Sequence, residues 1–347
     1  MRGASAARAV AESGRRPDEA RRARAIGLWL LACCVALAAL VVVGGLTRLT
    51  RSGLSIVEWR PVTGVLPPLG EAAWEEAFAQ YRETPEYRLV NAGMSLAQFK
   101  GIYGWEYAHR LLARAVGVLF LVPLLVFALR RRIDRALAVR LGGVFALGLA
   151  QGAMGWYMVA SGLVDEPRVS HLRLAAHLGL ALALFAALFW LALDQLRARR
   201  ETRPSSARRG SLAALATALV ALVFVQTLAG ALVAGTHAGL AFSDFPLMGG
   251  AWIPPGMGSL PTLRENLLDN VVTLHFTHRA LAWALLALSG VFLWRVLRDR
   301  RAPGLRPAAV RLGVALALQF ALGVATVVLR VPLALAAAHQ AGAVLVL

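Results

Sequence analysis

Cysteine is almost absent from the sequence. The chain contains two, Cys33 and Cys34, and they are adjacent inside an apolar run. Neighbouring cysteines cannot pair as an ordinary disulfide, and they do not have the spacing of metal ligands. We therefore interpret them as small packing residues and exclude both a disulfide framework and a thiolate metal site.

Charged residues are also scarce. They make up 16% of the 347 residues, whereas hydrophobic residues make up 58%. Soluble domains carry about 25% charged residues, so the composition predicts an all-α integral membrane protein. Eight apolar runs are long enough, or nearly so, to cross a hydrocarbon core about 30 Å thick. They cover residues 26–46, 107–129, 139–160, 174–194, 212–235, 277–294, 309–329 and 332–347. The last run has no polar flank, so we expect the chain to stop at or within its final helix.

Acidic residues number 19 against 37 basic residues, which gives a net charge of +18. Such a charge is also typical of nucleic-acid-binding proteins, but here the arginines cluster beside the ends of apolar runs. They precede the first run and lie between runs two and three, four and five, and six and seven. The positive-inside rule makes these four segments cytoplasmic, so we expect both termini inside and no nucleic-acid partner. The acidic Glu12, Asp18 and Glu19 argue against an organellar transit peptide in the Arg-rich tail.

An internal repeat joins the two halves of the chain. It falls on unusual residues: His109-Arg110 matches His278-Arg279, His177 matches His339, and Gln151 with Gly155 matches Gln319 with Gly323. Chance matching of four histidines is improbable in so apolar a sequence. The predicted fold is eight transmembrane helices in two tandem pseudo-repeated four-helix bundles. The predicted domains are a cytoplasmic tail (1–25), an N-terminal half (26–200), a cytoplasmic linker (201–211) and a C-terminal half (212–347).

The first outer loop carries amphipathic helical spacing over residues 71–90 and 95–100, with Ser95 as an N-cap. These segments either lie along the outer surface as a lid or serve as inert connectors.

Four histidines lie within or at the outer ends of the even-numbered runs, at similar depth: His109, His177, His278 and His339. Each one alone is better explained by a hydrogen bond to a neighbouring helix, but four at repeat positions favour ligation. Two imidazoles from facing helices suit a haem iron, whereas zinc or di-iron sites need clustered carboxylates or thiolates that these helices scarcely supply. The sequence therefore predicts two bis-histidine haem sites, and only the repeat favours pairing within each half. The remaining histidines, His171, His237 and His275, are expected in or near outer loops.

Arginines and glycines surround the predicted haem sites. Glycines in several helices allow close approach of a flat macrocycle or of a neighbouring helix. Five arginines are expected either to pair with haem propionates or to anchor helix ends at the interface. They are Arg48, Arg51, Arg60, Arg110 and Arg279.

Glu106 breaks the symmetry of the repeat. It precedes His109 by three residues and shares its helix face, whereas the matching position in the second half is His275. Glu106 is either a group that acts beside the macrocycle or an ordinary acid at a helix start.

Long motifs in this sequence resemble the haem A synthase family, in the form found in mitochondria and related bacteria. The resemblance runs from about residue 26 to the end, through GGLTRLTRSGLSIVEWRPVTGVLPP, EYRLVNAGMSLAQFKGIYGWEYAHR, QGAMGWYMVASGL, RLAAHLGLA, FPLMGGAWIPP and FTHRALAW. It implies an oxidoreductase that oxidises the C8 methyl of haem O to a formyl group, with oxygen from water, and so gives haem A for cytochrome oxidase assembly.

The resemblance also implies roles for individual residues. His109 and His177 would be axial ligands of the substrate haem, His278 and His339 would hold a haem b, and Glu106 would be the catalytic residue. It implies a multi-pass protein of the bacterial inner membrane with its haem sites toward the periplasm. Implied partners are the haem O synthase, a farnesyltransferase, together with an electron acceptor and a second copy of the chain. The cysteine pair that some bacterial relatives carry in the first outer loop is missing here.

Two other functions use the same residues. A two-haem, bis-histidine quinol cytochrome would transfer electrons through the four histidines without changing a porphyrin. A proton-coupled transporter built on parallel repeats would use the histidines as proton carriers and bind no haem.

Overall fold

The computed structural model describes residues 2–60, 63–163, 169–197, 209–300 and 303–347. Seven helices in these ranges are long and apolar enough to cross a membrane. They are α1 (Arg2–Leu49), α4 (Leu96–Leu129), α5 (Arg135–Ala160), α6 (His171–Arg197), α7 (Arg209–Gly235), α9 (Val271–Arg298) and α10 (Arg306–Val328). An eighth apolar helix, α11 (Leu333–Val346), is shorter. The protein is thus a multi-pass, all-helical membrane protein across its described residues.

The helices agree with the predicted runs and extend beyond several of them. Most of the predicted linker, residues 201–211, lies outside the described residues, and α7 already begins at Arg209. The described part of the predicted tail continues α1 as a helix from Arg2. Hydropathy detects only the apolar part of a helix, so polar turns beyond the hydrocarbon core escape it.

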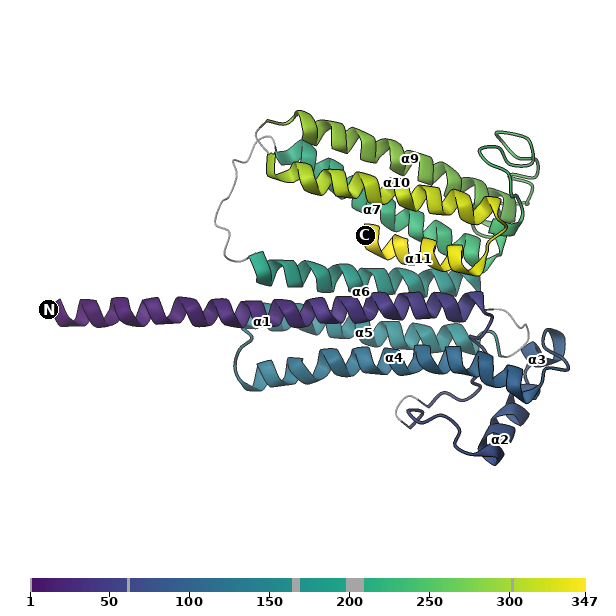
Figure 1. Cartoon of the computed structure of the whole chain (residues 1–347), viewed down its shortest axis with the longest axis horizontal. Coiled ribbons are helices and arrows are strands. Elements are labelled where there is room, and N and C mark those ends of the chain that lie inside the picture. Colours follow the sequence, from purple (N-terminus) through teal and green to yellow (C-terminus); the bar gives the residue numbers. More distant parts are fainter. Residues whose placement is uncertain (1, 61–62, 164–168, 198–208, 301–302) are drawn as a thin grey trace.

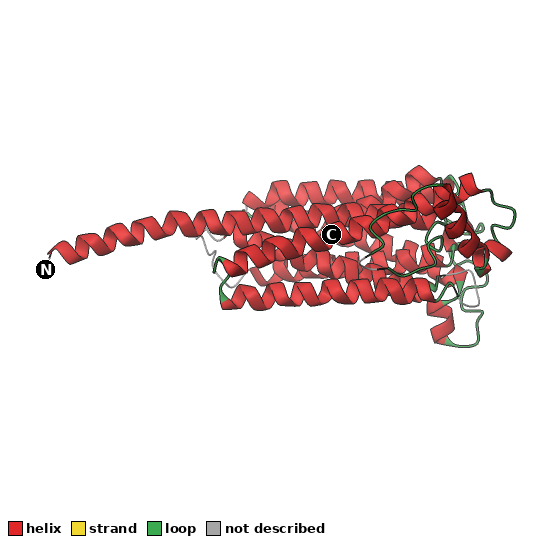
Figure 2. Cartoon of the chain, turned by 90° about the horizontal axis from the view of Figure 1, so that it is seen from below, coloured by secondary structure: helices red, strands yellow, loops and turns green. Residues whose placement is uncertain are grey.

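Short elements gather at one end of the bundle, which we call the loop end (Figure 1). They are α2 (Glu71–Arg82), α3 (Pro85–Leu89), the 3₁₀ turn η1 (Ala238–Leu240) and α8 (Leu263–Leu268). A further 3₁₀ turn, η2 (Pro303–Leu305), precedes α10 at the opposite end. Figure 2 shows the long helices side by side, with the N-terminal part of α1 projecting away from the loop end.

Side-chain caps fix where the helices begin. Ser95 caps α4 through a capping box with Gln98, which confirms the predicted N-cap. The predicted amphipathic segment 95–100 is not a separate element, because it forms the first turns of α4. Asn270 caps α9 by accepting hydrogen bonds from the backbone N–H groups of Val272 and Thr273.

The long helices pack in two groups. In the first group α1 packs on α4 and α6, and α5 packs on α6. In the second group α7 packs on α9, and α10 packs on α9 and α11. Contacts of α6 with α7 and of α1 with α11 join the two groups (Figure 1).

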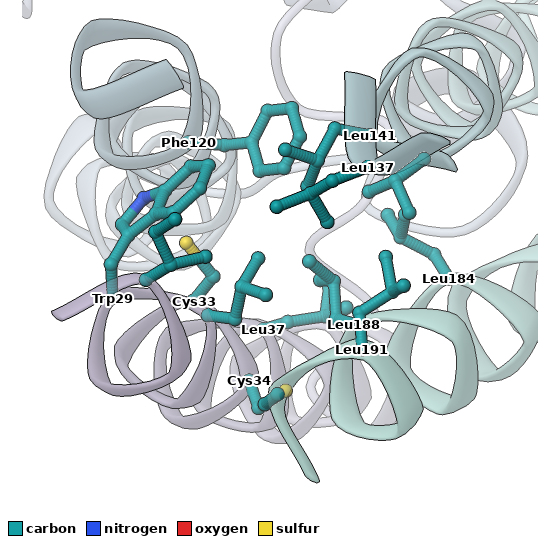
Figure 3. Close-up of a cluster of buried hydrophobic side chains, with 14 residues drawn as sticks. Trp29, Cys33, Cys34, Leu37, Phe120, Leu137, Leu141, Leu184, Leu188 and Leu191 are labelled. Carbon is teal, nitrogen blue, oxygen red and sulfur yellow. The ribbon is translucent and has the colours of Figure 1, made fainter. Parts of the chain in front are cut away.

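An apolar cluster fills the first group in its half away from the loop end (Figure 3). Trp29 stacks on Phe120 with ring centroids 5.4 Å apart, and its indole N–H donates to the Leu119 carbonyl at 2.9 Å. Cys33 and Cys34 are buried, unpaired members of this cluster, as their interpretation as packing residues predicts. The cluster ends before the loop-end half of these helices, and polar side chains occupy that half.

Candidate functional site

The four predicted ligand histidines lie in the loop-end half of the bundle, on α4, α6, α9 and α11. Each imidazole packs against a glycine of another helix. A Cβ built on these glycines would lie closer to the ring than non-bonded Cβ atoms usually come: Gly44 to His109 Nε2, 2.8 Å; Gly155 to His177 Cε1, 3.1 Å; Gly230 to His278 Cε1, 3.0 Å; Gly323 to His339 Cε1, 2.9 Å. A larger residue would push the imidazole away, so glycine at four equivalent places lets the ring lie against the facing helix.

The histidines associate within each group of helices. The imidazole of His109 lies within electrostatic range of His177, and that of His278 lies within range of His339. Of the three pairings open to four ligands, this arrangement favours the one in which each group holds its own pair.

Three glutamines accompany the histidines, and our sequence reasoning missed their role. Gln151 Nε2 lies 3.2 Å from His177 Nε2, and Gln226 Nε2 lies 3.4 Å from His278 Nε2. Gln319 Nε2 donates to the backbone carbonyl of His339 at 2.7 Å. The available signal was the spacing Gln-x-x-x-Gly, which places each amide one turn before the glycine that faces the histidine.

The helix that faces the fourth histidine, His109, carries no such glutamine. Four residues before Gly44, which faces His109, the chain carries Leu40. Across the described residues, no side-chain amide is hydrogen-bonded to the imidazole of His109. His109 is thus the one ligand candidate without a glutamine neighbour on the helix it faces.

Several polar atoms at these sites are buried and have no hydrogen-bond partner among the described residues. They are Nδ1 of His177, His278 and His339, and Oε1 of Gln151, Gln226 and Gln319. Burying one such atom without a hydrogen bond costs about 1–3 kcal/mol of folding free energy. Six of them at the histidine sites are consistent with sites that bind a ligand, because a ligand would change the hydrogen bonding of the imidazoles. A metal bound at Nε2 orders the ring and leaves Nδ1–H to an acceptor nearby.

The donor set fits haem better than a metal held by protein alone. No group of three or more His, Cys, Asp or Glu side chains comes together in the described part of the chain. Each group of helices instead offers two imidazoles and two glycine positions of close approach. Two axial imidazoles complete the coordination of a haem iron, whose other four ligands come from the porphyrin.

Glu106 lies on α4, one turn before His109, and its side chain is 3% exposed. Its Oε2 accepts hydrogen bonds from Ser55 Oγ at 2.8 Å and from the Ile56 backbone N–H at 2.9 Å. Its Oε1 accepts from Arg110 Nε at 3.1 Å and Nη2 at 2.7 Å. Four donors, two of them from a guanidinium, fix the position of the carboxylate. Glu106 is not an acid at a helix start, because α4 begins ten residues earlier, at Leu96.

His275 occupies the matching place on α9. Its Nε2 accepts a hydrogen bond from Arg279 Nε at 3.1 Å, as Glu106 accepts from Arg110. His275 lies near an outer loop, as predicted, since it stands in the second turn of α9 with its ring centroid 6.2 Å from that of Phe242; it is nevertheless buried, at 1% exposed. The Asn270 cap starts α9 at Val271, six residues before the predicted apolar run begins at residue 277.

Arg110 and Arg279 tie their helices to the preceding loops. Arg110 donates to the carbonyls of Glu58 and Ile56, both at 2.9 Å. Arg279 donates to the carbonyls of Asp244 at 2.8 Å, Leu247 at 3.0 Å and Phe242 at 3.1 Å. Each guanidinium thus spends most of its five N–H donors on the protein itself.

The other three arginines predicted to meet propionates lie apart. Arg48 donates to the Ala234 carbonyl of α7 and so links the two groups of helices. Arg60 is exposed and pairs with Glu58 at 2.5 Å, and Arg51 is exposed in the left-handed region, at φ 52°. The structure does not gather the five into one cluster, and their contact with propionates stays a prediction.

Comparison with known proteins covers nearly the whole chain. Residues 27–347 match the family model COX15-CtaA, described as cytochrome oxidase assembly protein. A protein of Nitrosospira multiformis named "Heme A synthase" is 51% identical over 323 residues, 92% of this chain and 90% of the relative. Proteins with the same name from Nitrosomonas eutropha and Parvibaculum lavamentivorans are 47% and 48% identical, over 92% and 93% of this chain and 90% and 91% of the relatives.

Proposed function

The chain belongs to the haem A synthase family of cytochrome oxidase assembly proteins, and from this premise we propose that it is an oxidoreductase that converts haem O to haem A. The reaction oxidises the C8 methyl of haem O to a formyl group, with water as the source of the oxygen. Its balance is R–CH₃ + H₂O → R–CHO + 4H⁺ + 4e⁻, so the site must supply water and release protons and electrons. The four electrons must leave to a one-electron acceptor.

The substrate site is the N-terminal one, between His109 and His177. The observation that supports this assignment is the position of Glu106. Its carboxylate is fixed one turn from His109, whereas the matching side chain in the second half is the imidazole of His275. Oxidation of a methyl group builds positive charge on its carbon, which a preorganised carboxylate stabilises. The same carboxylate orients the attacking water. Its four donors support this electrostatic role over that of a free base.

His278 and His339 are the residues that would hold a haem b. Such a haem supplies one-electron transfer, because bis-histidine ligation leaves its iron no open position. Gln226 and Gln319 donate to the backbone carbonyls of His278 and His339 at 3.1 and 2.7 Å, and so hold the helix segments that carry the two imidazoles. Gly230 and Gly323 keep room beside them for a flat ring.

We further propose that α11 completes eight transmembrane helices in two tandem four-helix units, divided as the predicted domains are. The arginine-rich segments support an orientation with both termini in the cytoplasm of a bacterial cell and the loop end toward the periplasm. Haem O enters from the lipid, where its hydrophobic tail remains.

Analysis of the haems of purified protein tests this function. A reduced-minus-oxidised spectrum detects bis-histidine haem, and chromatography of the extracted haems identifies haem b, haem O and haem A. We expect haem b together with haem O or haem A. Haem b alone, at two per chain, would instead identify an electron-transfer cytochrome, and a chain without haem would identify a transporter.

A further inference from the structure

A second carboxylate, Glu86, is buried near the N-terminal site. Glu86 lies in the first turn of α3 and is 6% exposed. It is enclosed where Tyr81 of α2 stacks on Phe99 of α4, with ring centroids 5.1 Å apart. Its Oε2 is buried without a hydrogen-bond partner in the described ranges. A buried carboxylate oxygen without a hydrogen-bond partner lowers the free energy of unfolding. A functional role would explain why a glutamate stands at this position.

Two charged groups act on Glu86. Glu106 of α4 disfavours its charge, whereas Arg51, which follows α1, favours it; the neighbouring Tyr81 of α2 is itself held neutral, with its pKa raised to about 12. Burial, and then the charge of Glu106, raise the pKa of Glu86 to about 7. Glu86 therefore exchanges a proton near neutral pH, whereas both carboxylate oxygens of Glu106 are already occupied by four hydrogen-bond donors.

A cleft of about 610 Å³ at the loop end is lined by residues that neighbour both carboxylates. Thr50, Ser52, Asn91, Gln98 and Trp105 are among its lining residues. The Asn91 backbone N–H donates to the Glu86 carbonyl at 3.1 Å, and Trp105 directly precedes Glu106. Hydroxyl groups continue inward from the cleft wall: Ser52 pairs with Thr50 at 2.7 Å, and Ser55 donates to Glu106 at 2.8 Å.

We propose that Glu86 is a proton-accepting residue of the N-terminal site, which takes up protons released by the substrate and passes them to water in the outer cleft. The inference rests on the proposed function, because oxidation of R–CH₃ with water to R–CHO releases four protons together with four electrons. The electrons leave to a one-electron acceptor, and the protons leave one at a time through Glu86. Glu106 is held in place by four hydrogen-bond donors, so its role is to stabilise the reacting carbon, and Glu86 takes up the protons.

The test is Glu86→Gln in full-length protein in membrane vesicles, loaded with haem O and supplied with ferricyanide as the one-electron oxidant. In the wild type we expect the rate of haem A formation to rise with pH and level off above about pH 7, as Glu86 loses its proton. Glu86→Gln should lower the rate about 10- to 100-fold and remove this pH dependence. Glu86→Asp should restore part of both. The matched control is Glu83→Gln, since Glu83 is exposed, pairs with Arg88 and lies on the same loop segment; it should behave as wild type.

Haem content and thermal unfolding separate this role from a structural one. Glu86→Gln removes an unpartnered buried carboxylate, so it should keep both haems and unfold at the wild-type temperature or above. An unchanged rate and pH profile in Glu86→Gln would overturn the inference, and so would loss of haem from that variant. Wild-type protein that forms no haem A would sink the proposed function itself.

Discussion

The first group of helices places Glu106 one turn before His109, whereas the second places His275 one turn before His278. Both side chains accept a hydrogen bond from an arginine four residues later, and both arginines hold the preceding loop by its carbonyls. The scaffold is therefore the same in the two groups, and the chemistry at one position differs. A second difference lies at Leu40, which stands where α5, α7 and α10 carry glutamine.

These differences suggest how one repeat serves two purposes. A resident cofactor needs ligands that are held firmly, and His278 and His339 each have a glutamine neighbour. A substrate must leave after reaction, and His109 has Leu40 in that place. Glu106 lies at this same site, beside His109, where its carboxylate stabilises the carbon that is oxidised.

Removing single histidines is expected to have the largest effect. His109→Ala should abolish retention of haem O and haem A while leaving haem b, and His339→Ala should abolish retention of haem b. The physical reason is the pairing of ligands within each group. Extracted haems of each purified variant, quantified by chromatography, provide the measurement. If either variant lost both kinds of haem equally, the division of labour between the halves would be refuted.

Lysine in place of the two arginines tests the shared scaffold. Arg110→Lys removes paired charged hydrogen bonds to Glu106, each worth about 1.5–3 kcal/mol, so haem A formation should fall about 10- to 100-fold. Arg279→Lys loosens an equivalent loop without touching a carboxylate, so its effect on haem A formation should be much smaller. The ratio of haem A to haem O in membranes distinguishes the two variants. Equal losses would mean that loop docking, and not Glu106, controls the reaction.

Exchange of glutamine and leucine tests how firmly each site holds its haem. Gln226→Leu should speed loss of haem b to apomyoglobin about tenfold, in the range expected when a group that orients a ligand is removed. Leu40→Gln should slow the loss of haem O or haem A from the first site. The control is Gln80→Leu on α2. Gln98→Leu would not serve, because Gln98 belongs to the capping box of α4. Faster haem loss in Leu40→Gln would contradict the account.

The smallest effect concerns the stability of α3. The pKa of Glu86 is raised from its ordinary value of 4.5 to about 7, so the folded state binds a proton more tightly than the unfolded state. Stability is then full below about pH 4.5 and declines as pH rises toward 7. Hydrogen exchange of the α3 amides, corrected for intrinsic rates, should show greater local opening at pH 8 than at pH 5. Glu86→Gln should remove this difference, and a persistent difference would locate its cause elsewhere.

Much of the fold was predictable because long apolar runs carry a strong signal. The eight runs and the Ser95 cap follow from hydropathy and local capping chemistry. Burial of His275 escaped prediction because α9 starts at Asn270, before the apolar run, and because loop residues cover it. Glu86 escaped because its burial depends on packing between α2, α3 and α4, which no local pattern records. The glutamines escaped because their contacts join different helices.

Glu106→Gln tests the central claim most directly. The variant keeps the shape of the side chain and removes its charge, so purified protein should contain haem b and haem O in wild-type amounts. Chromatography of its extracted haems should show haem A reduced at least a hundredfold, while His275→Gln, the matched change in the second half, should still form haem A. A wild-type yield of haem A from Glu106→Gln would contradict the account.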